Sequence, residues 1–347
     1  MSSKVSIRDI AEKTGLSITT VSRALNGKAK EYRISKKSQQ LIERAAKELN
    51  YVPNYFAVNL KSGKSNTIGL IIPSLSNPFF ANIASVINNE VRKQGYTLLI
   101  ADSNENIETE KMVVQQFVAR NIDGFIIVPS GIAVKHIESL NAQGLPLILM
   151  DRYFENSNIP FVSTDNFEGA VMATEHLLNH GHSSIACIQG VKQSTPNKLR
   201  VNGFKETMQK AGKSAFRIVG DDFSVQNGYL ETKLMLQWDE RPSAIFTLSN
   251  TIAMGCLQAL KEEKISVPDD ISIISFDDHP YLDFLETPIT SIAQPVEHIC
   301  KIALRYLFSR INDNEKSIPN QVFLKPELKI RESVSRITVT TSNQSLE

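Results

Sequence analysis

Short apolar runs alternate with helical segments from Thr67 onward, and this alternation constrains the fold more than any other feature of the chain. Strands that are apolar on both faces and alternate with helices are typical of parallel sheets covered on both sides. The runs form two successive sets, so we predict an α/β protein with two doubly wound lobes. The expected strands are 68–72, 97–100, 124–128, 147–150, 185–188, 244–247 and 271–276, and the expected helices include 81–94, 108–120, 169–179, 198–211 and 253–263.

The first fifty residues predict a small domain of three helices that contains a helix-turn-helix. Ser6 can cap the first helix, with Asp9 three positions after it. Gly15 tolerates the positive φ that a tight turn often needs, and Ser17 can cap a second helix over Ile18–Leu25. Two short helices joined by a turn with glycine are the signature of a helix-turn-helix.

The outward face of the second helix is short, polar and basic, which suits a reader of the major groove. Its inward positions are Val21, Ala24 and Leu25, and a third helix over about 35–49 completes the domain. In that third helix we expect five residues to be buried: Leu41, Ile42, Ala45, Ala46 and Leu49. The residues predicted to contact DNA are Ser6, Ser17, Ile18, Thr19, Thr20, Ser22, Arg23 and Asn26. The alternative is a three-helix domain with no nucleic-acid partner.

Charge is divided unevenly along the chain. Residues 1–64 hold 13 Lys and Arg against 5 Asp and Glu, a net charge of +8, and the remainder has a net charge of −7. A basic end on an acidic body suits contact with phosphates at one end only. The expected phosphate neighbours are Lys4, Lys28, Lys30, Arg33, Lys36 and Lys37. Taken alone, such a run is more often a solvated face.

The phrase SIRDIAEKTGLSITTVSRALNG, followed by ELNYVPN, resembles the LacI/GalR family of bacterial repressors, and the similarity continues through most of the chain. The resemblance implies a dimeric repressor whose segment after the YxPN motif folds into a short hinge helix on DNA. It places Asn54, Ala57 and Leu60 on DNA, with Leu60 as a wedge in the minor groove. A short helix is marginal alone, and apolar wedges kink DNA by unstacking it. The alternative is an ordinary linker. One departure is 27–34, which is longer than the usual loop.

Aromatic and polar side chains recur where the predicted strands end. Ligands of open parallel sheets bind beyond the carboxyl ends of the strands, and two facing lobes make a cleft that a hinge motion can close. Aromatic rings can cover the apolar faces of a sugar, and Asp, Asn, Gln and Arg can bond its hydroxyl groups. The residues predicted to bind such an effector are Asn77, Phe79, Phe80, Asp151, Arg152, Arg200, Phe223, Asn250, Asp277 and Gln294.

This set also resembles, position by position, the pentose site of periplasmic ribose-binding proteins, which implies a periplasmic-binding-protein-like core. Thr251 departs from the pattern, because relatives usually carry Asp after the Asn. Ribose, another aldose and a nucleoside therefore all stay open. Single residues have structural alternatives as well: Phe80 as plain core, Asp151 and Asp277 as caps of turns, and Arg152 as the partner of Asp151.

Several classes of protein lack support in the sequence. No apolar run approaches the ~18 residues of a membrane helix, and MSSKVSIRDI lacks the apolar core of a signal peptide. Three widely spaced cysteines, Cys187, Cys256 and Cys300, imply neither disulfides nor a zinc site. His176, His180 and His182 have a spacing that can hold a metal, but the end of a helix before Gly181 explains them better. We expect no metal and no cofactor.

The predicted organisation is a head at 1–50, a hinge segment at 51–65, a core at 66–337 and a polar tail at 338–347. Within the core, the first lobe is about 66–163 plus 293–322, and the second lobe is about 164–292 plus 323–337. The tail has no leucine heptads, so we expect a homodimer and no tail-built tetramer. We predict a cytoplasmic, ligand-responsive transcriptional repressor that senses a sugar and binds a near-palindromic DNA site. The alternatives are a solute-binding protein of a sugar transporter, against which the helix-turn-helix argues, and an enzyme, for which no catalytic motif is present.

Overall fold

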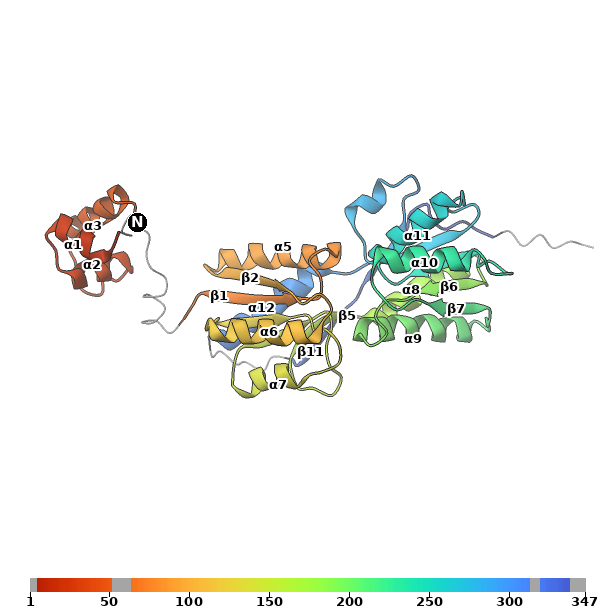
Figure 1. Cartoon of the computed structure of the whole chain (residues 1–347), viewed down its shortest axis with the longest axis horizontal. Coiled ribbons are helices and arrows are strands. Elements are labelled where there is room, and N and C mark those ends of the chain that lie inside the picture. The colour runs from red at the N-terminus through yellow and green to blue at the C-terminus, as the bar shows by residue number, and fades with distance from the viewer. Residues whose placement is uncertain (1–4, 52–63, 313–318, 338–347) are drawn as a thin grey trace, which may run out of the picture. The chain divides into compact units, whose positions relative to one another are not determined.

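The computed structural model describes residues 5–51, 64–312 and 319–337. The chain divides into two compact units, Met1–Ser65 and Asn66–Glu347, and each is described by itself (Figure 1). The residues predicted to bind DNA from the hinge segment, Asn54, Ala57 and Leu60, lie outside the described residues, as do the expected hinge helix and the tail. These therefore stay predictions.

The head consists of α1 (Ile7–Thr14), α2 (Ile18–Leu25) and α3 (Lys36–Glu48). The backbone N–H and the hydroxyl of Ser6 both donate to the Asp9 carboxylate, at 2.7 and 2.9 Å, which fixes the start of α1. Gly15 ends that helix at a φ of 67°, in the left-handed region. The Ser17 hydroxyl accepts from the Thr20 N–H at 3.1 Å and caps α2. The predicted helix-turn-helix is confirmed.

The core of the head is formed by Ile10, Val21 and Ile42, all with no exposed surface. The prediction that Leu41 is buried is wrong, because its side chain is 46% exposed. The buried stripe of α3 runs through Ile42 and Ala45 and continues to the half-buried Ala46 and Leu49. Leu41 lies one residue before this stripe and points about 100° away from it.

The first lobe of the core contains a six-stranded sheet in the order β11-β5-β4-β3-β1-β2. All its strand pairs are parallel. Helices α5 and α12 pack on one face and α6 and α7 on the other. The elements are β1 (Thr67–Ile72), α5 (Pro78–Lys93), β2 (Thr97–Asp102), α6 (Ile107–Ala119), β3 (Gly124–Ile127), α7 (Lys135–Ala142), β4 (Leu147–Met150), β5 (Phe161–Thr164), α12 (Val296–Ile311) and β11 (Gln321–Leu324).

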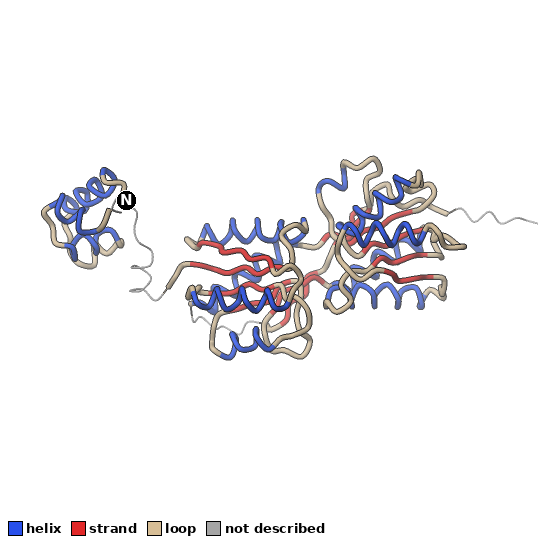
Figure 2. Tube along the Cα trace, viewed as in Figure 1, coloured by secondary structure: helices blue, strands red, loops and turns tan. Residues whose placement is uncertain are grey.

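The second lobe repeats this architecture in the order β12-β10-β9-β8-β6-β7, with β12 antiparallel to β10. Helices α8 and α9 cover one face, and α10 and α11 cover the other (Figure 2). The elements are α8 (Asn166–Asn179), β6 (Ile185–Ile188), α9 (Thr195–Lys210), β7 (Phe216–Val219), α10 (Val225–Met235), β8 (Ala244–Thr247), α11 (Asn250–Glu262), β9 (Ser272–Phe276), the 3₁₀ helix η1 (Pro280–Asp283), β10 (Thr290–Ala293) and β12 (Glu327–Lys329). The predicted α/β fold with two doubly wound lobes is confirmed.

The chain passes between the two sheets three times, after β5, after β10 and after β11. The third passage follows Leu324 instead of residue 322, because Phe323 and Leu324 pair with Ser163 and Thr164 in the sheet of the first lobe. These three passages join the lobes, so residues beside them lie close to both lobes.

The cysteines and the histidine cluster have structural surroundings. All three cysteines are buried and unpaired with one another, and burial raises the pKa of Cys256 and Cys300 to about 12. The His180 ring bonds the His176 carbonyl oxygen at 2.8 Å, and the His182 ring bonds Ser243 and Ser335. Among the residues that the structure describes, none of the helices is both long and apolar enough to cross a membrane.

Candidate effector site and DNA-reading surface

Nine of the ten predicted effector residues line one cavity in the core. Its lining comes from both lobes and consists of Asn77, Phe79, Phe80, Asp151, Arg152, Pro196, Arg200, Phe223, Ser249, Asp277 and Gln294. Pro196 and Ser249 were not predicted. The empty space is about 310 Å³, part of it open to solvent.

Two carboxylates occupy equivalent positions in the two lobes. Asp151 directly follows β4, Asp277 directly follows β9, and both are about 95% buried. Their φ angles are 62° and 69°, in the left-handed region that residues other than glycine rarely adopt. Such backbone strain persists only where the surrounding structure enforces it, and it is concentrated at binding sites.

One of the two buried carboxylates lacks a hydrogen bond that a buried charge needs. The Oδ1 atom of Asp151 is buried and has no hydrogen-bond partner. Burial raises the pKa of Asp151 to about 6, although Arg200 and Arg152 act in the opposite direction. Burial likewise raises the pKa of Asp277, opposed by Arg200 and by the amide of Gln294. A donor from a bound ligand would satisfy the unpaired oxygen of Asp151.

Asn250 is the predicted effector residue that does not line the cavity. It begins α11, and its backbone N–H bonds Asp277, which lowers the pKa of that carboxyl. Both polar atoms of its side-chain amide are buried and have no hydrogen-bond partner. An unpaired buried amide is costly, so a donor and an acceptor are available directly beside the cavity.

The two arginines of the site are held by different partners. Arg152 forms a bidentate pair with Glu105, at 2.7 and 2.6 Å, so the alternative of an Arg152–Asp151 pair is wrong. Its guanidinium lies 5.8 Å from the ring centre of Phe80 and 5.9 Å from that of Phe223. Arg200 stacks on the Phe276 ring at 3.7 Å. Glu105 was missed because it lies in the loop after β2, away from every motif of the sequence.

The aromatic residues are both core and lining. Phe79 and Phe80 pack edge to face, with ring centres 5.2 Å apart, and they belong to the core cluster under α5 and α12. Phe223 lies against Gly190, where a Cβ atom would come within 2.2 Å of the ring. The Thr251 hydroxyl donates to the Phe223 carbonyl oxygen at 2.9 Å. A carboxylate at position 251 has no hydrogen to donate, so the departure from the family pattern stabilises this loop.

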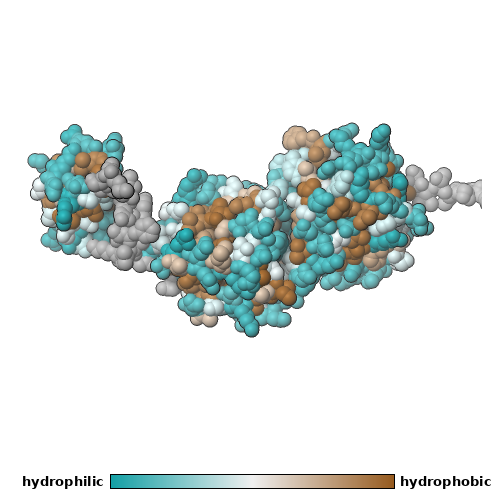
Figure 3. All heavy atoms as spheres, in the orientation of Figure 1, coloured by the Kyte–Doolittle hydropathy of each residue, from teal (hydrophilic) through white to brown (hydrophobic). Residues whose placement is uncertain are grey.

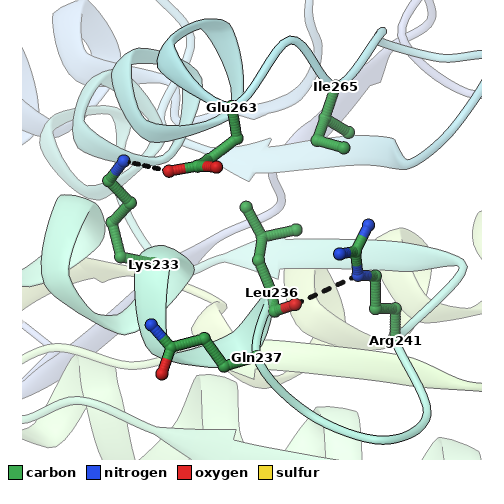
Figure 4. Close-up of a pocket in the computed structure, with 6 residues that line it drawn as sticks. All are labelled: Lys233, Leu236, Gln237, Arg241, Glu263 and Ile265. Carbon is green, nitrogen blue, oxygen red and sulfur yellow. Dashed lines mark hydrogen bonds and ion pairs between the residues drawn. The ribbon is translucent and has the colours of Figure 1, made fainter.

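In a second hollow, in the second lobe, the basic side chains have partners within the protein (Figure 4). It is lined by Lys233, Leu236, Gln237, Arg241, Glu263 and Ile265. Lys233 pairs with Glu263 and, at 3.4 Å, with Glu262, and the Arg241 Nε donates to the Leu236 carbonyl oxygen at 3.0 Å. The carboxyl ends of α10 and α11 meet here and disfavour anions. The cavity at the strand ends is therefore the better candidate.

The predicted DNA-reading residues of the head lie on its surface. Ile18 and Thr19 are exposed, and Thr20, Ser22 and Arg23 are half-exposed. The Arg23 guanidinium lies 3.8 Å above the ring of Tyr32, and the Asn26 amide donates to the Ser22 carbonyl oxygen at 2.7 Å. Tyr32, in the long loop before α3, was not predicted. A stacked arginine is already oriented before it meets DNA.

Comparison with known proteins separates the same two parts. Residues 6–54 match the model of the bacterial regulatory proteins of the lacI family, and residues 174–334 match a periplasmic binding protein-like domain. A ribose operon repressor of Halalkalibacterium halodurans is 35% identical over 88% of this chain and 90% of its own. The HTH-type transcriptional repressor PurR of Pasteurella multocida is 32% identical over 94% of this chain and 98% of its own.

Two solved structures are similar to the fold. The lac repressor dimer bound to operator and the anti-inducer ONPF has a TM-score of 0.86 and 24% identity, covering 96% of this chain and 99% of its own. A LacI family transcriptional regulator from Enterococcus faecium with bound ribose has a TM-score of 0.71 and 28% identity, covering 78% and 100%. Three of these four proteins are named repressors and the fourth a transcriptional regulator, and neither a transporter component nor an enzyme is among them. The chain therefore belongs to the lacI family of bacterial regulatory proteins and is a ligand-responsive, DNA-binding transcriptional repressor.

Proposed function

We propose that the effector of this repressor is a free sugar, ribose or a close aldose, and that it binds in the cavity between the lobes. The observation that carries the proposal is the group of unsatisfied buried polar atoms in and beside that cavity, the Oδ1 of Asp151 and the amide of Asn250. A site built to bond hydroxyl groups favours a polyol strongly, because an apolar ligand leaves its buried polar groups unpaired.

The relatives support a pentose. One is named a ribose operon repressor, and a structural relative contains bound ribose. In this cavity, Phe79 from the first lobe and Phe223 from the second would face the ring of the sugar. Asp151, Asp277 and Asn250 would bond its hydroxyl groups, and Asn77, Phe80, Arg152, Arg200 and Gln294 would complete the site. A nucleoside is the competing ligand.

DNA binding is assigned to the head. Helix α2 would enter the major groove with Ile18, Thr19, Thr20, Ser22, Arg23 and Asn26, and with its cap Ser17, while Ser6 contacts the backbone. A near-palindromic operator would be read by a homodimer, since two equivalent half-sites require two heads. Because the chromosome lies there, we place the protein in the cytoplasm.

The core offers apolar surface for that dimer. Leu75, Ile100 and Met112 are exposed in the first lobe, and the second lobe exposes Val225, Leu230, Leu234, Met254 and Phe284. Figure 3 shows apolar patches on one face of both lobes. Exposed apolar patches are a feature of protein interfaces. A dimer that buries surface of both lobes would transmit a movement between the lobes to the two heads.

Calorimetry of the full-length protein with ribose, other aldoses, phosphorylated sugars, nucleosides and purines tests the ligand. We expect ribose or a close aldose to bind, and Asp277→Ala to abolish binding while operator binding in a gel shift persists. Arg23→Ala is the converse test, because it should weaken operator binding by about tenfold or more and leave sugar binding intact. Binding of only a phosphorylated sugar or a purine would refute the sugar assignment.

A further inference from the structure

Two residues outside the cavity are bonded to two residues that line it. The Thr164 hydroxyl donates to the Gln294 Oε1 at 2.5 Å. The Arg200 Nε donates to the Asn166 Oδ1 at 2.8 Å. Thr164 and Asn166 are both fully buried, and neither carries a signal in the sequence. Each bonds one of the predicted effector residues without lining the cavity itself.

These contacts close into a ring through the centre of the site. The Gln294 Nε2 donates to the Asp277 Oδ1 at 2.5 Å, and the Arg200 guanidinium lies 3.9 Å from the same oxygen. The Asn166 Nδ2 donates to the Thr164 carbonyl oxygen at 3.0 Å. The ring therefore runs from Thr164 through Gln294, Asp277, Arg200 and Asn166 and back to Thr164.

The ring lies where the chain passes between the lobes. Thr164 is the last residue of β5 in the first lobe, and Asn166 is the first residue of α8 in the second. Gln294 directly follows β10, at the second passage. One of the three connections between the lobes is thus bonded directly to the carboxylate of Asp277, through Gln294, and a second reaches it through Gln294 and Arg200.

The donors and acceptors of the ring follow from two groups with fixed roles. A carbonyl oxygen can only accept and a guanidinium can only donate, so the Asn166 amide must place its Oδ1 on Arg200 and its Nδ2 on Thr164. An ionised carboxylate can only accept, so the Gln294 nitrogen faces Asp277 and the Gln294 oxygen takes the hydrogen of the Thr164 hydroxyl. Without that hydroxyl, the Gln294 oxygen loses its donor, and the amide is no longer held in place beside Asp277.

We propose that Thr164 and Asn166 are positioning residues of the effector site, which fix Gln294 and Arg200 as donors and connect Asp277 to the passages between the lobes. The inference rests on the proposed function in taking a sugar as the ligand. Thr164 and Asn166 themselves do not touch the sugar. Their effect reaches it through the orientation of Gln294 and Arg200.

The test compares Thr164→Val and Thr164→Ser in the full chain by calorimetry with ribose. Loss of the hydroxyl should weaken ribose binding by about tenfold, and serine should restore it to within about threefold. Thr174→Val is the matched control, because Thr174 is also fully buried and donates within α8 to the Ala170 carbonyl oxygen. It should leave ribose affinity within about threefold. In a Gln294→Leu background, Thr164→Val should cause no further loss.

An equal loss of affinity in Thr174→Val, or an undiminished loss in the Gln294→Leu background, would overturn the proposal. If the wild type binds none of the sugars, the proposed ligand fails, but the ring can still be tested on the ligand-free protein. Thr164→Val should then lower the melting temperature less in an Asp277→Asn background than in the wild type, because an amide at 277 tolerates a rotated Gln294. Additive effects of the two substitutions would refute the ring.

Discussion

At the scale of single residues, Asp151 combines burial, a left-handed backbone and an unpaired carboxylate oxygen. Burial raises its pKa to about 6, and the charged groups facing it are Arg200, Arg152, Asp277 and Glu105. Because this pKa exceeds the ordinary value of 3.8, the folded protein binds more protons than the unfolded chain between these two values. The contribution of Asp151 to stability therefore falls as pH rises through this window and stays constant above about 6.

Sugar binding should have the opposite dependence on pH. The ionised carboxylate accepts two or more hydroxyl hydrogens, whereas the protonated form has lost part of that capacity. We expect ribose affinity to rise as pH increases toward about 6 and to level off above it. Below that value the loss should reach at most about tenfold per pH unit. Calorimetry across the range measures it. Asp151→Asn should bind weakly without this rise, and the same rise in that variant would assign it to another group.

Thr251, also at the scale of single residues, departs from the family pattern and has a structural role of its own. Its hydroxyl contacts both the Ser249 hydroxyl, at 2.9 Å, and the Phe223 carbonyl oxygen. The loop that carries Phe223 is therefore bonded to the start of α11. The resemblance predicted an effector-binding residue at the neighbouring Asn250. It did not predict the contact made by Thr251, because that contact involves a loop distant in sequence.

At the scale of elements, the close crossing of α10 and α11 holds this part of the site together. A Cβ atom on Gly255 would lie 1.9 Å from the Val225 carbonyl oxygen, and one on Gly228 would lie 2.1 Å from the Ile252 carbonyl oxygen. Both obstacles are backbone atoms and cannot rotate away. The two glycines therefore allow α10, which follows Phe223, to contact the helix that begins with Asn250.

Gly255→Ala should separate the two helices. We expect the free energy of unfolding to fall by about 2–3 kcal/mol, as for overpacking against a rigid neighbour, with weakened ribose binding because Phe223 and Asn250 shift together. Thermal or urea unfolding of the core measures the change. Gln258→Ala, on the exposed face of the same helix, is the control and should stay within about 0.5 kcal/mol. A fully stable Gly255→Ala protein would show that the crossing can relax without cost.

At the scale of the whole molecule, a signal in the core has to reach DNA through the hinge segment. A ligand shifts DNA affinity only if it binds the two states of the core with different affinity. The ring around Asp277 touches two passages between the lobes, so a ligand that bonds Asp277 is placed where it can bias their relative position. Residues 1–64, with a net charge of +8, supply the attraction to phosphates in either state.

A substitution at Leu60 distinguishes sequence-specific DNA binding from general DNA binding. If it inserts into the minor groove, Leu60→Ala should lower affinity for the operator by about tenfold or more and affinity for random DNA far less, because electrostatic attraction does not need it. Gel shifts on both DNAs at several salt concentrations compare the two. Lys61→Ala, the adjacent basic residue, is a useful contrast, since it should weaken both DNAs similarly and reduce the salt dependence. Equal losses in Leu60→Ala would indicate a general defect of the hinge segment.

Much of the architecture is readable from the chain alone, because its signals are local. A cap such as Ser17 bonds an N–H three residues away, and the left-handed turn at Gly15 depends on one residue. Buried strands such as β4 are recognisable in the sequence because they are continuous apolar runs. β7, β11 and β12 have no fully buried residue, and β11 alternates between exposed and half-buried positions, so these strands do not stand out in the same way. Leu41 shows the limit of periodicity, which gives the phase of a helix only to within one residue.

The residues of the candidate site likewise form two groups, one that the sequence predicts and one that it does not. Strand-end residues such as Asp151 and Asp277 were recognisable because parallel strands end at one edge of their sheet. Their partners were not, because these partners come from far along the chain: Glu105 pairs with a residue 47 positions away and Thr164 with one 130 positions away. A hydrogen bond requires atoms within about 3 Å, and no local pattern of sequence records which distant atoms meet. Local propensity thus specifies the elements and their ends, whereas the packing of two lobes decides which buried groups are paired and which remain free for a ligand.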